Sequence, residues 1–229
     1  MNYNNNQYAT MAEGFMSKVY GWMAAGLCVT AGVAYYLSPA VNPALFKSIS
    51  GSLFIFMMLQ LGLVLFFSFA WKSLSYVALA TLFIVYSGMM GITLSPIAYI
   101  YTGESIFQVF LIAASMFGIM AVYGAVTKTD LSSMGNILFM GLIGLIVANF
   151  INMFWQNAQF DIITSCIGVG LFALLTAYDV QKLRAFGSQS LASEEDMDKL
   201  ALLGALTLYL YIINIFFYLL RLFGQKKND

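Results

Sequence analysis

Seven apolar stretches run through the sequence, and each has roughly the length of a helix that crosses a lipid bilayer. They cover approximately residues 19–37, 53–71, 76–94, 106–126, 137–154, 162–178 and 200–223. The hydrocarbon layer is about 30 Å thick and an α-helix rises about 1.5 Å per residue, so about 20 residues cross it. Because a helix satisfies its own backbone hydrogen bonds in lipid, the sequence predicts an all-α membrane protein with seven transmembrane helices.

The composition excludes several classes of function. Apolar residues make up 61% of the 229 residues and charged residues 9%, whereas soluble domains have about 45–50% and about 25%. The formal net charge is zero and there is no histidine. We therefore expect no nucleic-acid partner, no enzymatic activity, no catalytic residues, no metal centre and no cofactor. Cys28 and Cys166 lie inside apolar stretches, which favours small buried packing residues over a disulfide.

The predicted domain organisation is simple. A polar N-terminal tail covers residues 1–17, a single transmembrane domain covers 18–224, and a polar C-terminal tail covers 225–229. The longest connection, residues 181–199, holds seven of the twenty charged residues. Within it, Ser193 precedes three acidic residues, a capping pattern that predicts a helix from about Glu194 into the last span. We interpret these acids as a solvated helix start, because the alternating ligands and glycine turn of a calcium loop are absent.

Basic residues in the connections suggest an orientation. Six of the ten Lys and Arg residues fall on the side of the N-terminus and four on the opposite side. Cytoplasmic loops carry the excess of Lys and Arg, so this bias favours a cytoplasmic N-terminus.

Polar residues inside the spans need partners, because unpaired polar groups are costly in lipid. The candidates are Gln60, Glu104, Asn149, Asn152, Asp179 and Asn214. The amides are most simply interhelical hydrogen-bond donors and acceptors. Asp179 has two interpretations: an interfacial carboxylate paired with Lys182, or a titratable latch that faces the interior of the bundle.

Several motifs resemble one known family. They include Leu-Thr-Ala-Tyr-Asp-Val-Gln at residues 175–181 and Leu-Tyr-Leu at 208–210 followed by Asn214. Further matching stretches occur at residues 18–24, 86–96, 123–135 and 139–145. The chain resembles the Bax inhibitor family, the transmembrane Bax-inhibitor-motif proteins, and most of all its bacterial branch, from about residue 19 to residue 224.

The resemblance implies a fold and a function. It implies six helices that surround a central C-terminal helix, in a pH-sensitive calcium leak channel of a bacterial inner (plasma) membrane. It also implies the alternative of a non-conducting regulator, because family members modulate stress and cell death and some bacterial ones associate with a membrane-anchored AAA protease. The implied partners are the lipid bilayer, calcium ions or protons, and such a membrane protein. For the regulator, the contact surfaces would be the N-terminal tail and residues 181–199.

One position departs from the family pattern. The family mechanism uses two aspartates that share a proton, and Asp179 matches the first. The second lies in Leu-Tyr-Leu-Asp-Phe-Ile-Asn, where this chain has Leu-Tyr-Leu-Tyr-Ile-Ile-Asn at 208–214, so Tyr211 takes its place. A tyrosine is a neutral donor at physiological pH, and we predict that Tyr211 donates a hydrogen bond to Asp179 and that pH gating is altered. The resemblance assigns Asp179, Tyr211, Asn214 and Gln60 to the gate and ion pathway, and position alone suggests Glu104 as a pore-mouth residue.

Overall fold

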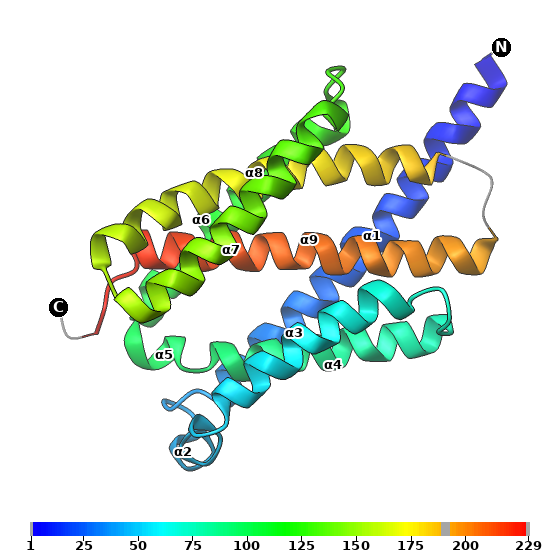
Figure 1. Ribbon diagram of the computed structural model, residues 1–229. Helices are drawn as coiled ribbons and strands as arrows, with labels where there is room; N and C mark the ends of the chain where they lie inside the picture. The colour runs from blue at the N-terminus through cyan, green and yellow to red at the C-terminus, as the bar shows by residue number, and fades with distance from the viewer. Residues whose placement is uncertain (1, 189–192, 228–229) are drawn as a thin grey trace. The chain divides into compact units, whose positions relative to one another are not determined.

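The computed structural model describes the backbone of residues 2–188 and 193–227, and the side chains from Thr10 onward. The elements formed by these residues are helices joined by turns and loops, as predicted (Figure 1). The helices are α1 (Asn2–Tyr36), α2 (Pro43–Ser50), α3 (Leu53–Ala70), α4 (Tyr76–Leu94), α5 (Ile97–Ile100), α6 (Gly103–Val126), the 3-10 turn η1 (Ser132–Met134), α7 (Gly135–Trp155), α8 (Ala158–Gly187) and α9 (Glu194–Phe223).

In the part of the chain that the structure describes, six helical segments are long and apolar enough to cross a membrane. They are Leu53–Ala70, Tyr76–Ile100, Gly103–Val126, Ser132–Trp155, Ala158–Gly187 and Glu194–Phe223. These match six of the seven predicted spans. Helix α1 is not among them, because residues 19–36 mix their apolar side chains with glycine, threonine, tyrosine and tryptophan. The prediction of seven spans is therefore confirmed only for six.

The chain divides into two compact units. The first unit comprises Met1–Thr102, Phe186–Tyr209 and Lys226–Asp229, and the second comprises Gly103–Ala185 and Leu210–Gln225. Helices α8 and α9 contribute residues to both units.

In the first unit, α4 packs against both α1 and α3 (Figure 1). The contact with α1 is close because Gly26 has no side chain: a Cβ atom there would lie 2.7 Å from the Phe83 ring. At this contact the Thr30 hydroxyl lies 2.6 Å from the Tyr209 hydroxyl and donates to the Ser87 carbonyl at 2.9 Å. All three residues are buried, so this hydrogen-bonded cluster joins α1, α4 and α9 inside the first unit.

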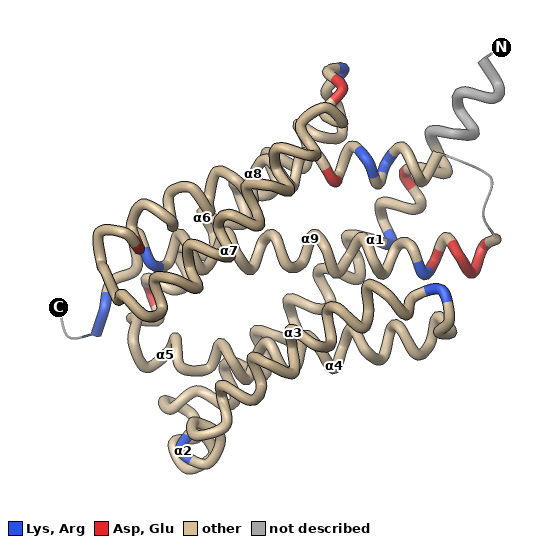
Figure 2. Tube along the Cα trace, viewed as in Figure 1, with Lys and Arg blue, Asp and Glu red and all other residues tan. Residues whose placement is uncertain are grey.

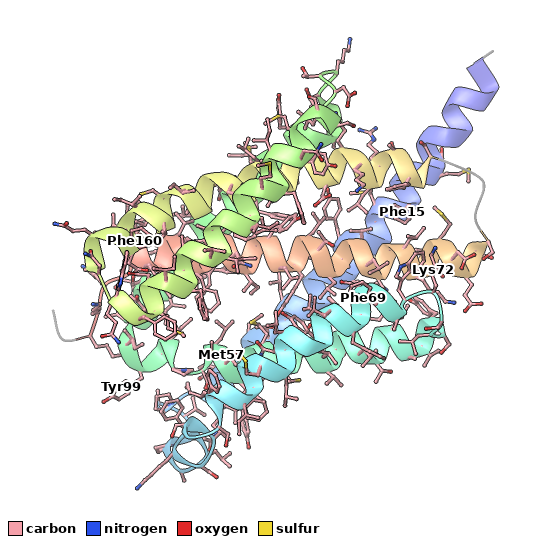
Figure 3. The ribbon with its side chains drawn as sticks, in the orientation of Figure 1. Phe15, Met57, Phe69, Lys72, Tyr99 and Phe160 are labelled. Atoms are coloured by element: carbon pink, nitrogen blue, oxygen red, sulfur yellow. The ribbon has the colours of Figure 1, made fainter. Side chains whose placement is uncertain are left out.

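Helix α1 continues back through the stretch predicted as an N-terminal tail. Its backbone is helical from Asn2, and one face of its first half is buried: Ala12, Phe15, Met16 and Val19. The spacing of these residues is that of a helix with one packed side. Phe15, labelled in Figure 3, lies against Gly187 at the end of α8, where a Cβ atom would approach the ring to 2.9 Å. The polar composition of residues 1–17 concealed this packed face.

Helix α9 begins at Glu194, as the sequence predicts. The Ser193 hydroxyl accepts a hydrogen bond from the Asp196 amide at 3.2 Å and caps the helix. The side chains of Lys18 and Asp198 form an ion pair between α1 and α9 in the first unit. The predicted connection 181–199 is largely helical, because α8 extends to Gly187. Residues 189–192 of that connection lie outside the described residues.

The outward surfaces of the helices are apolar, the reverse of a soluble protein. Helices α3, α4 and α7 carry no charged residue, and charges on the other candidate spans gather near helix ends (Figure 2). On α3, Met57 and Phe69 are exposed (Figure 3). The two cysteines are free, as expected, but exposed rather than buried. An apolar neighbourhood did not imply burial for them, because lipid-facing positions are apolar too.

The hydrogen-bonded cluster of the first unit generates a stability prediction. Replacing Thr30 by valine keeps the shape but leaves the Tyr209 hydroxyl and Ser87 carbonyl without this partner. We expect a loss of about 1–3 kcal/mol in the free energy of unfolding, measured as a lower midpoint of thermal unfolding (Tm) in detergent. Thr81→Val is the control, because the exposed Thr81 bonds to Val77 of its own helix. An equal Tm for the two variants would contradict the prediction.

Candidate functional site

Asp179 and Tyr211 form a hydrogen bond in the second unit. Asp179 lies near the end of α8 and is half-buried, and the Tyr211 hydroxyl of α9 donates to its Oδ2 atom at 2.5 Å. The Tyr211 ring is held by Phe172 of α8, with 5.7 Å between ring centroids. The hydrogen bond predicted from the sequence is therefore present.

The neighbour of Asp179 that the sequence offered as an ion-pair partner makes a different contact. The Lys182 ammonium lies 5.8 Å from the centroid of the Tyr178 ring, a distance typical of a cation–π interaction. The aspartate thus has a phenol as its hydrogen-bond partner.

Two glycines position the residues that precede Asp179. A Cβ atom at Gly124 of α6 would lie 2.8 Å from the Ala177 carbonyl carbon, and one at Gly135 of α7 would lie 2.6 Å from the Tyr178 hydroxyl. Three consecutive residues of α8 therefore contact three different helices. Within the motif at residues 175–181, the side chains of Tyr178, Asp179 and Gln181 therefore each contact a different element.

The same end of α8 also holds the connection between α6 and α7. Gln181 accepts a hydrogen bond from the Leu131 amide and donates one to the Thr129 carbonyl, each at 2.9 Å. Arg184 donates to the Ala125 carbonyl at the end of α6. In that connection the Ser132 amide donates to Asp130, which lowers the pKa of this exposed carboxyl below its ordinary value. These roles of Gln181 and Arg184 were not predicted from the sequence.

The other predicted site residues lie apart from this pair or bond locally. Asn214 is one turn beyond Tyr211 on α9 and donates to the Leu210 carbonyl at 2.7 Å. Glu104 lies in the first turn of α6 and accepts a hydrogen bond from the Gln108 side chain at 3.2 Å. Gln60 belongs to the first unit, where it is buried and donates to Thr93 of α4 at 3.0 Å. The structure brings Asp179 and Tyr211 together, whereas the gate and mouth roles of these residues stay predictions.

A second polar cluster in the same unit was also missed. Arg221 of α9 forms an ion pair with Asp161 of α8 at 3.0 Å, and it donates to the Asn149 side-chain oxygen of α7 at 3.4 Å. Asn149 in turn donates to the Tyr218 hydroxyl at 3.1 Å, so its predicted interhelical role is confirmed. The only sequence signal for this pair was the position of its members: Asp161 lies in the first turn of α8 and Arg221 in the last turn of α9.

These features define a class of protein. The long apolar helices, the lipid-facing surfaces and the polar contacts placed between helices are those of a multi-pass helical membrane protein. Among the described side chains, those of residues 10–188 and 193–227, no group of three or more His, Cys, Asp or Glu that could hold a metal ion is present.

Comparison with known proteins then gives the family. Residues 12–228 match the family described as "Inhibitor of apoptosis-promoting Bax1". The inner membrane protein YbhL of Escherichia coli is 43% identical over 216 residues, which cover 93% of this chain and 92% of that protein. An uncharacterized protein of Borreliella burgdorferi is 41% identical, over 94% and 93% of the two chains. The uncharacterized protein YrjE of Lactococcus lactis is 35% identical, over 98% and 97%. The chain belongs to the Bax inhibitor family, as its motifs predicted.

The glycine contact beside Asp179 can be tested by adding one methyl group. Gly124→Ala places a Cβ atom against the backbone of α8, and we expect a Tm several degrees lower in detergent. Gly118→Ala is the matched control on the same helix, because a Cβ atom there meets nothing within 4 Å. A Tm for Gly124→Ala as high as that for Gly118→Ala would show that α6 and α8 do not approach so closely.

The hydrogen bond itself can be removed without changing the ring. Tyr211→Phe leaves Asp179 without its donor, and we expect a loss of about 1–2 kcal/mol in the free energy of unfolding. Thermal unfolding in detergent measures this, with Tyr99→Phe as the control at an exposed tyrosine (Figure 3). If both variants unfold at the wild-type temperature, the hydrogen bond contributes nothing to stability.

Proposed function

We propose that this protein is a calcium leak pathway of a bacterial inner membrane, gated by the hydrogen bond between Asp179 and Tyr211. The observation that carries the proposal is this bond, which joins α8 and α9 in the second unit. A carboxylate beside a pathway attracts cations, and a donor that occupies the carboxylate competes with them. Breaking one hydrogen bond then frees an anionic group for the passing ion.

The proposed topology has seven spans, six of which surround α9. Helix α1 has 35 residues and extends about 52 Å, which is enough to cross the membrane and continue beyond it. In the most apolar window of α9, 61% of residues are buried, against 44% or less in the other candidate spans. This burial supports a central α9, and the name of the Escherichia coli relative supports an inner membrane location. The excess of basic residues supports a cytoplasmic N-terminus.

The pair should respond to protons differently from two aspartates. Two neighbouring carboxyls titrate as a unit and hold one proton near neutral pH. A phenol has an ordinary pKa of about 10 and keeps its proton through the physiological range. The hydrogen bond of Tyr211 therefore persists across that range, and the leak should depend weakly on pH.

Calcium flux into liposomes tests the proposal. Wild-type protein should conduct with little pH dependence, Asp179→Asn should change the flux several-fold, and Tyr211→Asp should restore a steep pH response. Tyr99→Phe controls for changes at an exposed tyrosine. A steep proton dependence in the wild type that Asp179→Asn abolishes would contradict the altered gating. Flux no higher than in empty liposomes for every variant would contradict the channel itself.

The alternative function is a non-conducting regulator of a membrane-anchored AAA protease or another membrane complex. The exposed acids Glu194, Glu195 and Asp196 at the start of α9 favour it, since they offer a charged surface outside the bilayer. Among the described side chains of α1, the buried ones run from Ala12 onward. A deletion of residues 2–9 should thus keep the fold and any flux, yet abolish partner binding if this alternative is correct.

A further inference from the structure

The contact between α8 and α9 in the second unit has a polar pair at each end. Asp179 bonds to Tyr211 at one end, and Asp161 pairs with Arg221 at the other. At about 1.5 Å per residue, the two aspartates lie about 27 Å apart along α8, close to the hydrocarbon thickness. Between them the contact is aromatic: Phe172 packs against both Tyr211 and a second α9 tyrosine. The two carboxylates thus mark opposite ends of one helix contact.

Arg221 acts as a cation held among oxygen atoms. Its guanidinium bonds to the Asp161 carboxylate of α8 and to the Asn149 amide oxygen of α7, at 3.0 and 3.4 Å. It also lies 5.8 Å from the centroid of the Tyr218 ring. The side chains of Arg221 and Asp161 are 43% and 38% exposed. Ion pairs this open to solvent are weak, so the guanidinium can leave without unfolding the helices.

Ser165 supplies a further oxygen that has no partner. It is fully buried, and its Oγ atom makes no hydrogen bond within the described part of the chain. The adjacent Thr164 bonds to the carbonyls one turn earlier, as hydroxyls in helices usually do. Ser165 follows Asp161 by one turn and precedes Gly168, which packs against Tyr218 of α9. Residues three and four apart share a helix face, so Ser165 lies on the face of α8 that meets α9.

We propose that Asp161, Asn149 and Ser165 form a transit site for a calcium ion, which the Arg221 guanidinium occupies in this structure. Carboxylate, amide and hydroxyl oxygens are the ligands that calcium takes in proteins. Because only one of these ligands is a carboxylate, the site would bind calcium weakly, so the ion could bind and leave again. This inference rests on the proposed leak function and adds a second closure, at the end of α8 opposite Asp179.

Cysteine accessibility tests the site without relying on flux. In a Cys28→Ala, Cys166→Ala background, Ser165→Cys places a thiol in the site. A positively charged, water-soluble thiol reagent should modify it slowly while Arg221 is present, and at least several-fold faster with Arg221→Gln. Calcium should slow the reaction in the Arg221→Gln protein, and adding Asp161→Asn should remove that protection. Lys226→Gln is the charge-matched control and should leave the rate unchanged. Should Ser165→Cys fail to fold, Asn149→Cys probes the same cluster.

The outcomes separate this inference from the proposed function. An unchanged rate after Arg221→Gln, or no protection by calcium, overturns the transit site. A separate Cys28→Ala protein that keeps the exposed Cys166 shows how a thiol one residue further along α8 reacts. If calcium protects the thiol but no variant conducts calcium, the site stands and the leak function is overturned. If wild type conducts and Arg221→Gln leaves the flux unchanged, the closure by Arg221 is overturned.

Discussion

Polar groups inside a membrane have no water to bond, so an unpaired one is costly and a partner on another helix or on the group's own backbone is favoured. The polar contacts between helices in both units follow from this constraint. In the first unit, Thr30 meets Tyr209 and Gln60 meets Thr93. In the second, Asp179 meets Tyr211. Apolar side chains cannot select a neighbour in this way, because lipid is as favourable to them as protein. The polar residues thus determine which helix faces meet.

These polar contacts depend on how closely the backbones approach. Gly26 brings α1 against α4 beside Thr30, and Gly124 brings α6 against α8 beside Ala177. Hydrogen bonds require donor and acceptor within about 3 Å, a distance that a larger residue at either glycine would prevent. In both units a glycine contact and a polar contact therefore occur within about one turn of each other. The glycine lets the two backbones come close, and the polar pair determines which faces of the two helices meet.

The sequence predicted features that depend on local pattern. Lengths of apolar stretches gave six of the spans, and Ser193 with its acids gave the start of α9. The pairing of Asp179 with Tyr211 followed from a motif that places both residues. The pair of Asp161 with Arg221 was not predicted, because each looks like an ordinary charge at a helix end and sixty residues separate them. The burial of Phe15 was missed for a related reason: a polar segment gives no periodic signal strong enough to reveal one packed face.

Replacing an aspartate with Tyr211 has a consequence that follows from hydrogen-bond chemistry. Two carboxyls that share a proton consist of one donor O–H and one acceptor carboxylate. The Tyr211 phenol likewise donates its O–H to the Asp179 carboxylate. Its proton stays on the tyrosine, since the ordinary pKa of a phenol is about 10. The geometry is then that of a protonated pair at any physiological pH. On the proposed function, the pathway keeps its closed state but loses its sensor, and the leak is set by how often one hydrogen bond breaks rather than by the proton concentration.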